Sequence, residues 1–483
     1  MKQRRGRAAL TAWLGLLVLG NVTACGSITT AGQAVTQGEV AGLPVTHFES
    51  GRRSDAPIPK LDVENATSGE IDRLAIATIA DVTAYWTEQM PERFGQDFRP
   101  LSRLLSYDST TDDIRACDST TRGLVNAFFC AGEDLVAWDR GVLLPLVHDK
   151  YGPIAIVTVL AHEYGHALQF RLGDKAGISK TTKSIVKELQ ADCFTGNYFR
   201  YLAEGKSPYF TVSTSEGINA ALSALYWVRD APGALSGNQG AHGTAFDRTY
   251  AFQLGFEKGP QQCAAIDAAS VAERTTQQKF SEQDIESGKG DARIDEQTLG
   301  LVQESLAATF ESTGAQLPVV VGGSACPNGA STPPVSYCPD TNAVTVDLPA
   351  LGEVGEPIDM EAERRGKDSA GRGDFAAFAS VASRYALAVQ KAGGAKLDDA
   401  NTGLRSACLV GAWAGAANRP RPVDKIIRLS PGDLDEAILE MLQPKSLIAS
   451  DVNGIPVPNG FARIEALRIG YNQGVEPCGR TFS

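Results

Sequence analysis

The sequence predicts a mainly helical α+β fold built from two tandem homologous domains, the second of them degenerate. Apolar residues recur at helical spacing in residues 153–173 and 183–202, which predicts two helices joined by a loop. Ahead of them, extended apolar segments flank a Gly-containing turn at residues 131–134, which predicts a pair of strands. The same order of features returns in the second half of the chain, and such repetition is typical of duplication.

The N-terminal segment that ends at Cys25 has the layout of a secretory signal. Basic residues from Lys2 to Arg7 precede an apolar run from Ala8 to about Gly20, and small residues precede Cys25. This ending resembles a bacterial lipobox, in which the cysteine is lipidated. A membrane-spanning helix is disfavoured, because a span needs roughly 20 apolar residues. We expect a lipoprotein signal peptide at residues 1–25 and an extracytoplasmic protein, lipid-anchored through Cys25 to the outer face of the cell membrane.

Charge and composition narrow the classes of partner. The formal net charge of −12 argues against nucleic acid and fits a solvated, secreted surface. The chain that follows Cys25 is long enough for two ordinary domains. Residues 26–68 are rich in Gly, Thr, Ser and Pro with weak periodicity, which predicts a flexible tether between membrane and body.

The chain contains nine cysteines, and a lipid on Cys25 leaves an even number. An even set in an oxidising compartment indicates disulfides. Spacing alone does not give their connectivity, but the internal repeat favours one set of pairs. That set is Cys117–Cys130, Cys193–Cys263, Cys326–Cys338 and Cys408–Cys478.

The first of the two predicted helices carries a His-Glu-Tyr-Gly-His segment. Pro153 suits its first turn and Gly173 suits its end. His162 and His166 are four residues apart, so both project from one face and can reach one zinc ion. Glu163 is placed to act as general base on a water, a pattern typical of zinc metallopeptidases. The alternative is a helix with two surface histidines, against which the buried character of the flanking residues argues.

The second predicted helix carries two carboxylates on one face. Glu188 and Asp192 are four residues apart, and the intervening loop lets this helix fold back beside the first. Glu188 is the candidate third ligand, since catalytic zinc usually takes three protein ligands and one water. Asp192 is the candidate acceptor for the distal N–H of a ligating histidine, expected to be His162. The alternative is a pair of exposed acids. A third histidine of the metzincin type is excluded, because Leu172 occupies its place.

One further histidine lies in the same predicted domain. His242 is a candidate catalytic residue, because a zinc peptidase benefits from a hydrogen-bond donor near the developing oxyanion. An ordinary loop histidine is the equal alternative, and Arg248 is a second candidate donor. One strand of the predicted pair is expected to hold the substrate backbone at the edge of the cleft. A purely structural hairpin is the alternative.

Four segments of the first half form a recognisable set: Ala161–Gln169, Glu188–Cys193, His242–Arg248 and Gly255–Cys263. Together they resemble the bacterial putative neutral zinc metallopeptidase family. The resemblance covers about residues 70–265 and implies that Glu188, in its Glu-Leu-Gln-Ala-Asp segment, is the third zinc ligand. The lipobox and overall size are also similar to those of the actinobacterial lipoprotein peptidases called LpqM.

The second half repeats the pattern of the first without its candidate ligands. Residues 381–390 match 160–169, residues 404–408 match 189–193, and residues 470–478 match 255–263. The positions of His162, Glu163, His166, Glu188 and Asp192 then hold Ser383, Arg384, Leu387, Gly403 and Ala407. We expect a zinc metallopeptidase domain at residues 69–285 and a pseudopeptidase domain without metal ligands at residues 286–483. A chance likeness between alanine-rich helices is the alternative.

These observations predict a membrane-anchored, extracytoplasmic zinc peptidase that hydrolyses peptide or protein substrates. A zinc-activated water attacks the peptide bond, with Glu163 as general base. The alternative is a non-catalytic or partner-gated surface lipoprotein that acts as a binding or adaptor module. Residues 286–483 are then the candidate site for a protein partner, although they can also lengthen the cleft or cap it. The substrate, the choice between endo- and exopeptidase action and the oligomeric state stay open.

Overall fold

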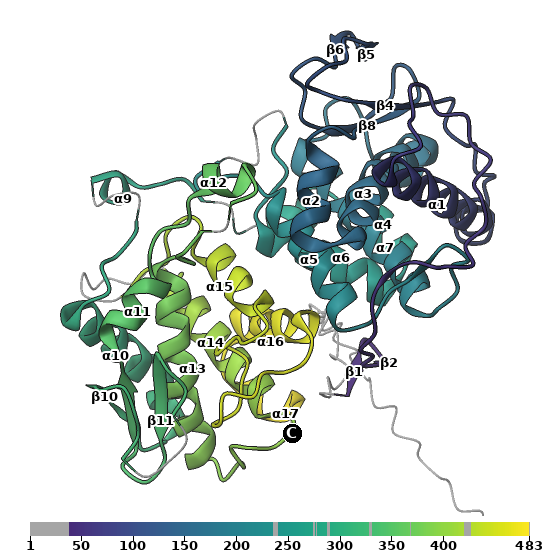
Figure 1. The fold of residues 1–483 in the computed structure, drawn as a ribbon. Coiled ribbons are helices and arrows are strands. Elements are labelled where there is room, and N and C mark those ends of the chain that lie inside the picture. Colours follow the sequence, from purple (N-terminus) through teal and green to yellow (C-terminus); the bar gives the residue numbers. More distant parts are fainter. Residues whose placement is uncertain are drawn as a thin grey trace, which may run out of the picture. The chain divides into compact units, whose positions relative to one another are not determined.

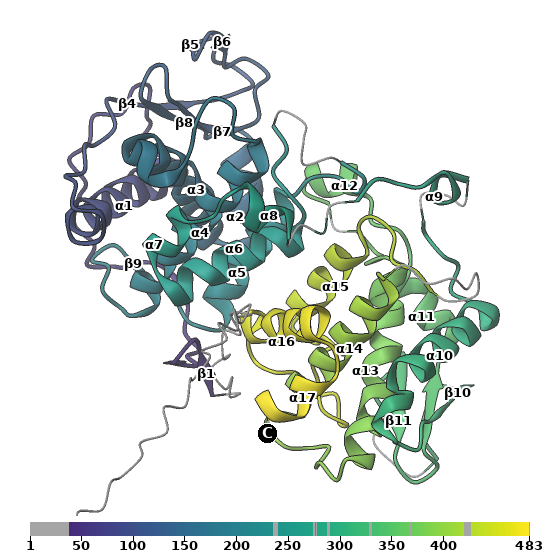
Figure 2. The same ribbon diagram turned by 180° about the vertical axis from the view of Figure 1, so that it is seen from behind.

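The computed structural model describes residues 38–482 apart from residues 235–239, 274–275, 277, 287–289, 328–330, 368 and 420–426. Helices predominate and the sheets are small (Figure 1, Figure 2), so the predicted mainly helical α+β class is confirmed. No described helix has the length and apolar character needed to cross a membrane. The expected signal peptide, Cys25 and the first part of the expected tether lie outside the described residues.

The first half is built around one buried helix, α3 (Pro153–Leu172). It packs against α1 (Glu70–Phe94), α2 (Leu143–Tyr151), α4 (Ser184–Ala203) and α5 (Glu216–Trp227). Every side chain from Ile154 to Leu160 is buried, which accounts for the continuous apolar run in the sequence. The helices expected at 153–173 and 183–202 are α3 and α4, each within one residue at its ends.

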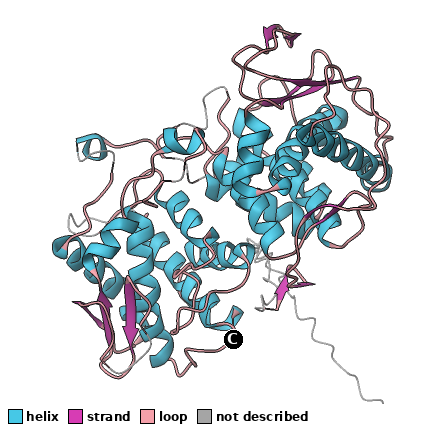
Figure 3. Ribbon diagram, in the orientation of Figure 1, coloured by secondary structure: helices cyan, strands magenta, loops and turns pink. Residues whose placement is uncertain are grey.

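A three-stranded sheet accompanies these helices (Figure 3). Its strands are β4 (Arg103–Tyr107), β7 (Ala127–Cys130) and β8 (Leu135–Asp139), in the order β4-β8-β7. Strand β8 runs parallel to β4 and antiparallel to β7. The strand pair predicted around residues 131–134 is therefore β7 and β8, and β7 is an edge strand of this sheet.

Helix α4 crosses α6 (Ala245–Lys258) at a distance that admits no side chains. A Cβ built on Gly255 would lie 1.7 Å from the carbonyl oxygen of Cys193, and one on Gly196 would lie 1.9 Å from that of Phe252. Glycine is therefore required at both positions. The Cys193–Cys263 disulfide ties α4 to the short helix α7 (Pro260–Ala264) that follows α6.

The second half has a similar set of elements. Its strands β10 (Val319–Gly322), β11 (Val335–Cys338) and β12 (Ala343–Val346) lie in the order β10-β12-β11, with the same relative directions as β4, β8 and β7. Its main helices are α13 (Asp374–Ala392), α14 (Thr402–Ala417), α15 (Asp433–Leu442) and α16 (Gly460–Gln473). A Cβ on Gly470 of α16 would lie 1.7 Å from the carbonyl oxygen of Cys408 on α14.

All four disulfides expected from the sequence are present: Cys117–Cys130, Cys193–Cys263, Cys326–Cys338 and Cys408–Cys478. The second and fourth each span 70 residues of sequence. Helices α6 and α16 face each other through two aromatic contacts. The ring centroids of Phe246 and Tyr471 lie 5.4 Å apart, and those of Phe256 and Phe461 lie 5.2 Å apart.

Residues 38–68, expected from their composition to belong to a flexible tether, pack onto the first half. Strand β3 (Gly51–Arg52) pairs with β9 (Phe210–Thr211), and Val40 is fully buried. The backbone N–H of Thr46 donates to Oγ1 of Thr214 at 2.8 Å. Short Ser and Thr side chains thus bind the body through hydrogen bonds, which a compositional argument does not reveal.

The remaining elements are short or peripheral. In the first half they are β1 (Glu39–Val40), β2 (Leu43–Pro44), β5 (Arg115–Ala116), β6 (Ser119–Thr120), the 3₁₀ turn η1 (Gly173–Ala176), α8 (Ala268–Ala272) and α9 (Glu282–Glu286). In the second half they are α10 (Glu296–Phe310), η2 (Glu311–Thr313), α11 (Leu348–Val354), α12 (Met360–Arg364) and α17 (Glu476–Thr481).

Candidate metal centre

Helices α3 and α4 cross beside the candidate ligands. A Cβ built on Gly165 of α3 would lie 2.8 Å from the Cα of Ala191 on α4, so only glycine permits this approach. Gly165 precedes His166, and Ala191 lies between Glu188 and Asp192 in the sequence. The close crossing therefore brings the imidazoles of α3 and the carboxylates of α4 together.

His162, His166 and Glu188 form one group of potential metal ligands. His162 Nε2 lies 3.1 Å from Glu188 Oε2, and His166 Nε2 lies 3.5 Å from Glu188 Oε1. One donor atom from each of the three residues lies within 4.8 Å of the others. Ligands that bind one zinc ion tetrahedrally at roughly 2.0–2.1 Å lie about 3.3 Å from one another. The two measured separations fit that arrangement.

Each imidazole has an acceptor at Nδ1, which leaves Nε2 for a metal. His162 Nδ1 lies 2.7 Å from Asp192 Oδ1, and His166 Nδ1 lies 3.1 Å from Gln169 Oε1. The side-chain amide of Gln169 also donates to the carbonyl oxygen of Lys187 at 2.6 Å, which holds it in place. An acceptor at Nδ1 favours the tautomer whose lone pair is on Nε2.

Arg248 of α6 holds Asp192 from the other side. Its Nε and Nη2 each donate to a carboxylate oxygen of Asp192 at 2.8 Å, and its side chain is buried. Its Nη1 donates to the carbonyl oxygen of Val228 at 3.0 Å. Arg248 was a second candidate for an oxyanion donor, but in the structure its guanidinium positions Asp192.

Comparison with known proteins extends this picture. The chain matches the family described as "Putative neutral zinc metallopeptidase" over residues 45–268. One protein of Mycobacterium bovis and two of Mycobacterium tuberculosis strains, all described as uncharacterized, are each 30% identical to it over 216 residues. The aligned part covers 41% of this chain and 71% of each relative. The chain belongs to the putative neutral zinc metallopeptidase family.

No solved structure matches the chain significantly. The family match contains every candidate ligand, the candidate base Glu163 and His242, and it ends before the second half begins. It also begins at residue 45, inside the segment expected to be a tether. The likeness to LpqM lipoproteins is not tested by these comparisons.

The electrostatics of the candidate ligand group favour a cation. Burial opposes a positive charge on His162, but Asp192 and Glu188 outweigh it and raise the pKa of His162 to about 10. Burial likewise opposes a charged His166, and Glu188 reverses this and raises its pKa. Burial opposes ionisation of Glu188, yet the two imidazoles hold its pKa well below the usual value. The donor set and its field therefore fit the zinc ion that the family implies.

Glu163 lies beside the ligand group without belonging to it. Its Oε2 accepts a hydrogen bond of 2.9 Å from the backbone N–H of Phe129 on the edge strand β7. Burial is the largest influence on this carboxyl group and raises its pKa. A carboxyl group so placed is suited to accept a proton from a water next to the ligands.

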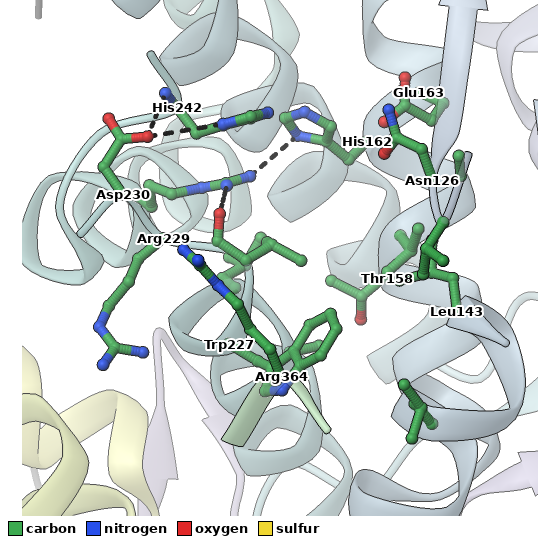
Figure 4. Close-up of a pocket in the computed structure, with 18 of the residues that line it drawn as sticks. Asn126, Leu143, Thr158, His162, Glu163, Trp227, Arg229, Asp230, His242 and Arg364 are labelled. Atoms are coloured by element: carbon green, nitrogen blue, oxygen red, sulfur yellow. Dashed lines mark hydrogen bonds and ion pairs between the residues drawn. The ribbon is translucent and has the colours of Figure 1, made fainter. Parts of the chain in front are cut away.

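A pocket of about 540 Å³ opens beside His162 and Glu163 (Figure 4). Its walls come from the segment around β7, from α2 and α3, and from the end of α5. Leu143, Val159 and Trp227 make much of the lining apolar, and Arg364 of α12 in the second half completes it. The volume is that of an ordinary small-molecule or side-chain site.

His242 lies at this pocket, with its side chain 50% exposed. Its Nδ1 is 3.6 Å from Oδ1 of Asp230, and its backbone N–H donates to the same oxygen at 3.0 Å. Figure 4 shows the His242 ring beside the ring of His162. The structure therefore brings His242 to the site that contains the candidate ligands.

Two contacts of the site were not predicted from the sequence. Gln169 is one, and its signal was present, because it follows His166 by three residues on the same helical face. The other is the Phe129 N–H bonded to Glu163, which has no side-chain signal because the donor belongs to the main chain.

Proposed function

We propose that this chain is a zinc-dependent peptidase that hydrolyses peptide bonds in extracytoplasmic peptides or proteins. The observation that carries the proposal is the ligand group of His162, His166 and Glu188 next to Glu163, with His162 and Glu163 lining a pocket. Three protein ligands leave a fourth position for water or substrate, as in catalytic zinc sites, whereas structural sites close all four.

His162, His166 and Glu188 would hold the zinc ion. When bound, zinc polarises the scissile carbonyl and makes the attacking water more acidic. Asp192 and Gln169 keep the two imidazoles in their orientation and tautomer. Burial opposes ionisation of Asp192, but Arg248 and His162 together lower its pKa.

Glu163 acts first as general base and then as general acid. Its carboxylate takes a proton from the attacking water and returns it to the leaving amine. The edge strand β7 supports binding of an extended peptide by strand addition, because its outer side lies at Glu163 and the pocket. His242 donates a hydrogen bond to the oxyanion as the tetrahedral intermediate forms.

We further propose that residues 286–483 are a pseudopeptidase copy of the first half. The matching sheet order, the two disulfides of equal span and the glycine crossings of α4/α6 and α14/α16 support this. The aromatic contacts between α6 and α16 support it as well. In the repeat, Phe246 corresponds to Phe461 and Phe256 corresponds to Tyr471. The Phe246–Tyr471 contact is therefore equivalent to the Phe256–Phe461 contact, as expected for two copies related by a two-fold axis.

The proposed role of the second half is to complete the substrate pocket. Arg364 lines the pocket, and Trp227 Nε1 donates to the carbonyl oxygen of Glu363 at 3.3 Å. Arg229 lies 3.6 Å from Glu363 Oε2 and 3.9 Å from Asp435 Oδ2. The second half therefore contacts the same pocket wall that would face the substrate. These contacts also favour the second candidate function, a partner-gated peptidase whose pocket changes when a partner moves this half.

The proposed location is the outer face of the cell membrane, through lipid on Cys25. Support comes from the pattern of residues 1–25 and from the four disulfides, which form and persist in oxidising compartments.

The test is cleavage of a diverse peptide library by the soluble chain from Gly26 onward, with Glu163→Gln at equal zinc content as control. Cuts made by the wild type and absent in the variant support the peptidase. Equal cutting by both would show a contaminant or a different mechanism. Zinc bound at one per chain without any cuts would favour the partner-gated or non-catalytic alternative. The next step would then be to remove the contacts at Glu363 and repeat the cleavage assay.

A further inference from the structure

A cluster of carboxylates lies in the second half, far in sequence from the candidate zinc ligands. One oxygen from each of Asp291, Asp374 and Glu436 lies within 4.8 Å of the others. Asp433 is also buried and interacts electrostatically with Asp374 and Glu436. We call these four residues the carboxylate cluster. It lies outside the family match, which ends at residue 268.

Asp374 has a buried oxygen atom without a hydrogen-bond partner. The residue is 5% exposed, and its Oδ2 accepts the backbone N–H of Ala292 at 2.9 Å. Its Oδ1 is buried and has no hydrogen-bond donor among the described residues. The carboxyl groups of Asp374 and Glu436 face each other within hydrogen-bonding reach, and neither has a proton to donate when both are ionised.

No lysine or arginine of the described part of the chain pairs with Asp374, Asp433 or Glu436. The arginine nearest in sequence, Arg372, instead donates to Glu440 at 2.6 Å. Burying several carboxylates together without a counter-charge is costly. The arrangement therefore calls for a cation or for protons shared between the acids.

The backbone holds the cluster in position. Gly373 has φ of 94°, and a Cβ built on it would lie 1.9 Å from Cδ of Glu436, so glycine makes room for that carboxyl group. Glu436 Oε2 accepts the backbone N–H of Phe375 at 2.8 Å, in the first turn of α13. Main-chain bonds thus fix the carboxyl groups of both Asp374 and Glu436, as ligands of a preformed site require.

We propose that Asp291, Asp374 and Glu436 bind a calcium ion that ties the loop at residues 290–292 to helices α13 and α15. A set of carboxylate oxygens suits hard cations, whereas zinc prefers nitrogen and sulfur ligands. Calcium accepts irregular oxygen sets, whereas magnesium demands a near-ideal octahedron and keeps several waters. Helix α15 also carries Asp435, whose Oδ1 accepts the backbone N–H of Phe246 at 3.1 Å. The ion therefore stabilises a helix through which the two halves touch, independently of peptidase activity.

The test is isothermal titration of Ca²⁺ into the soluble chain from Gly26 onward, stripped of metal and reloaded with one equivalent of Zn²⁺. We expect one Ca²⁺ per chain, with a Kd of about 10⁻⁴–10⁻³ M, and a thermal-unfolding midpoint that rises with Ca²⁺. Asp374→Asn and Glu436→Gln are expected to weaken binding by about tenfold or more. Asp291→Asn should do the same, and because Asp291 is exposed this variant should fold normally.

Glu440→Gln is the matched control, since it changes an acid to an amide on α15 while Glu440 is bonded to Arg372 instead of joining the cluster. It should bind Ca²⁺ as the wild type does. His162→Ala should lose Zn²⁺ and keep Ca²⁺, which separates the two sites. Absence of heat and of any shift in the wild-type midpoint up to about 10 mM Ca²⁺ would overturn the proposal and assign shared protons to the cluster. Equal weakening in Glu440→Gln would also overturn it.

Discussion

The guanidinium of Arg248 donates two hydrogen bonds of 2.8 Å to the carboxylate of Asp192, and the same carboxylate accepts a hydrogen bond of 2.7 Å from His162 Nδ1. The three side chains come from three different helices, α6, α4 and α3, and all are buried. The orientation of one candidate zinc ligand therefore depends on a residue two helices away.

Asp192→Asn is expected to weaken zinc binding about 10–100-fold, because the amide no longer provides a charged acceptor for His162 Nδ1–H. Competition with a chromophoric chelator measures the affinity. Asp81→Asn is the matched control, since Asp81 is also a buried helical aspartate but bonds to Tyr198 and Ser207. If both variants bind zinc as tightly as the wild type, Asp192 does not support the ligand.

His242→Ala is expected to lower kcat about 100-fold with little change in KM or zinc content, because an oxyanion donor acts in the transition state. Steady-state kinetics on a peptide found in the library measures both constants. His47→Ala is the control, since His47 pairs with Glu216 and does not line the pocket. An unchanged kcat in His242→Ala would return this residue to an ordinary loop histidine.

Arg364→Gln is expected to raise KM about 3–10-fold for peptides that carry a carboxylate near the scissile bond, with kcat unchanged. Arg364 is exposed at the pocket and, among the described residues, has neither an ion pair nor a hydrogen bond from its side chain. Its guanidinium is thus available for a substrate carboxylate. Arg365→Gln is the control, because Arg365 pairs with Glu361 on the same helix.

Paired peptides ending in a free acid or an amide, and paired Glu and Gln peptides, distinguish the source of that carboxylate. The same KM for every pair in wild type and Arg364→Gln would mean that the second half does not select substrates through this residue.

The free energy of unfolding is expected to fall as the pH rises from about 4.5 to 7, in part because of Glu257 on α6 and Glu465 on α16. Burial and the charge of Glu257 raise the pKa of Glu465 to about 7, and burial raises that of Glu257, although Arg468 and Lys258 oppose both. With an unfolded pKa near 4.3, the folded protein binds more protons in this window, so its stability declines with pH.

Glu465→Gln should reduce that decline by about 1–2 kcal/mol between pH 5 and pH 8. Chemical denaturation at both values measures it, and titrating groups that do not interact with Glu465 cancel between the two proteins. Glu476→Gln, which changes an exposed acid paired with Arg480, should leave the decline unaltered. The same pH dependence in Glu465→Gln and wild type would exclude the pair as its source.

The parts of the fold that were predictable depend on local spacing. Residues four apart share a helical face, so the spacing predicts that His162 and His166 lie on one face of α3 and that Glu188 and Asp192 lie on one face of α4. The disulfides were predictable for a different reason, because cysteines recur in the same order in the two halves and this repeat favours one set of pairs. The first argument uses short distances along the chain that a helix converts directly into positions in space, and the second uses a comparison between the two halves.

The contacts that escaped prediction join main-chain atoms or distant segments. The amide of Phe129 that bonds to Glu163 carries no residue signature. Arg364 reaches the pocket from the other half, and the carboxylate cluster assembles Asp291, Asp374 and Glu436 from three separate segments. Only the packing of helices brings such residues together, and a single sequence contains no periodicity that reports it.

The close crossing of helices α4 and α6 at Gly196 and Gly255 has a consequence for how the first half would acquire a metal ion. Helices α14 and α16 cross in the same way, and the Cys408–Cys478 disulfide ties α14 to α17, in a half of the chain whose sequence contains no histidine. Close packing of the main chain and a disulfide are therefore sufficient to form this helix crossing, without a bound metal ion. In the first half, a zinc ion would then enter a scaffold that is already folded, and would add to a stability that does not depend on it. A chelator would then remove the ion from such a protein without unfolding it.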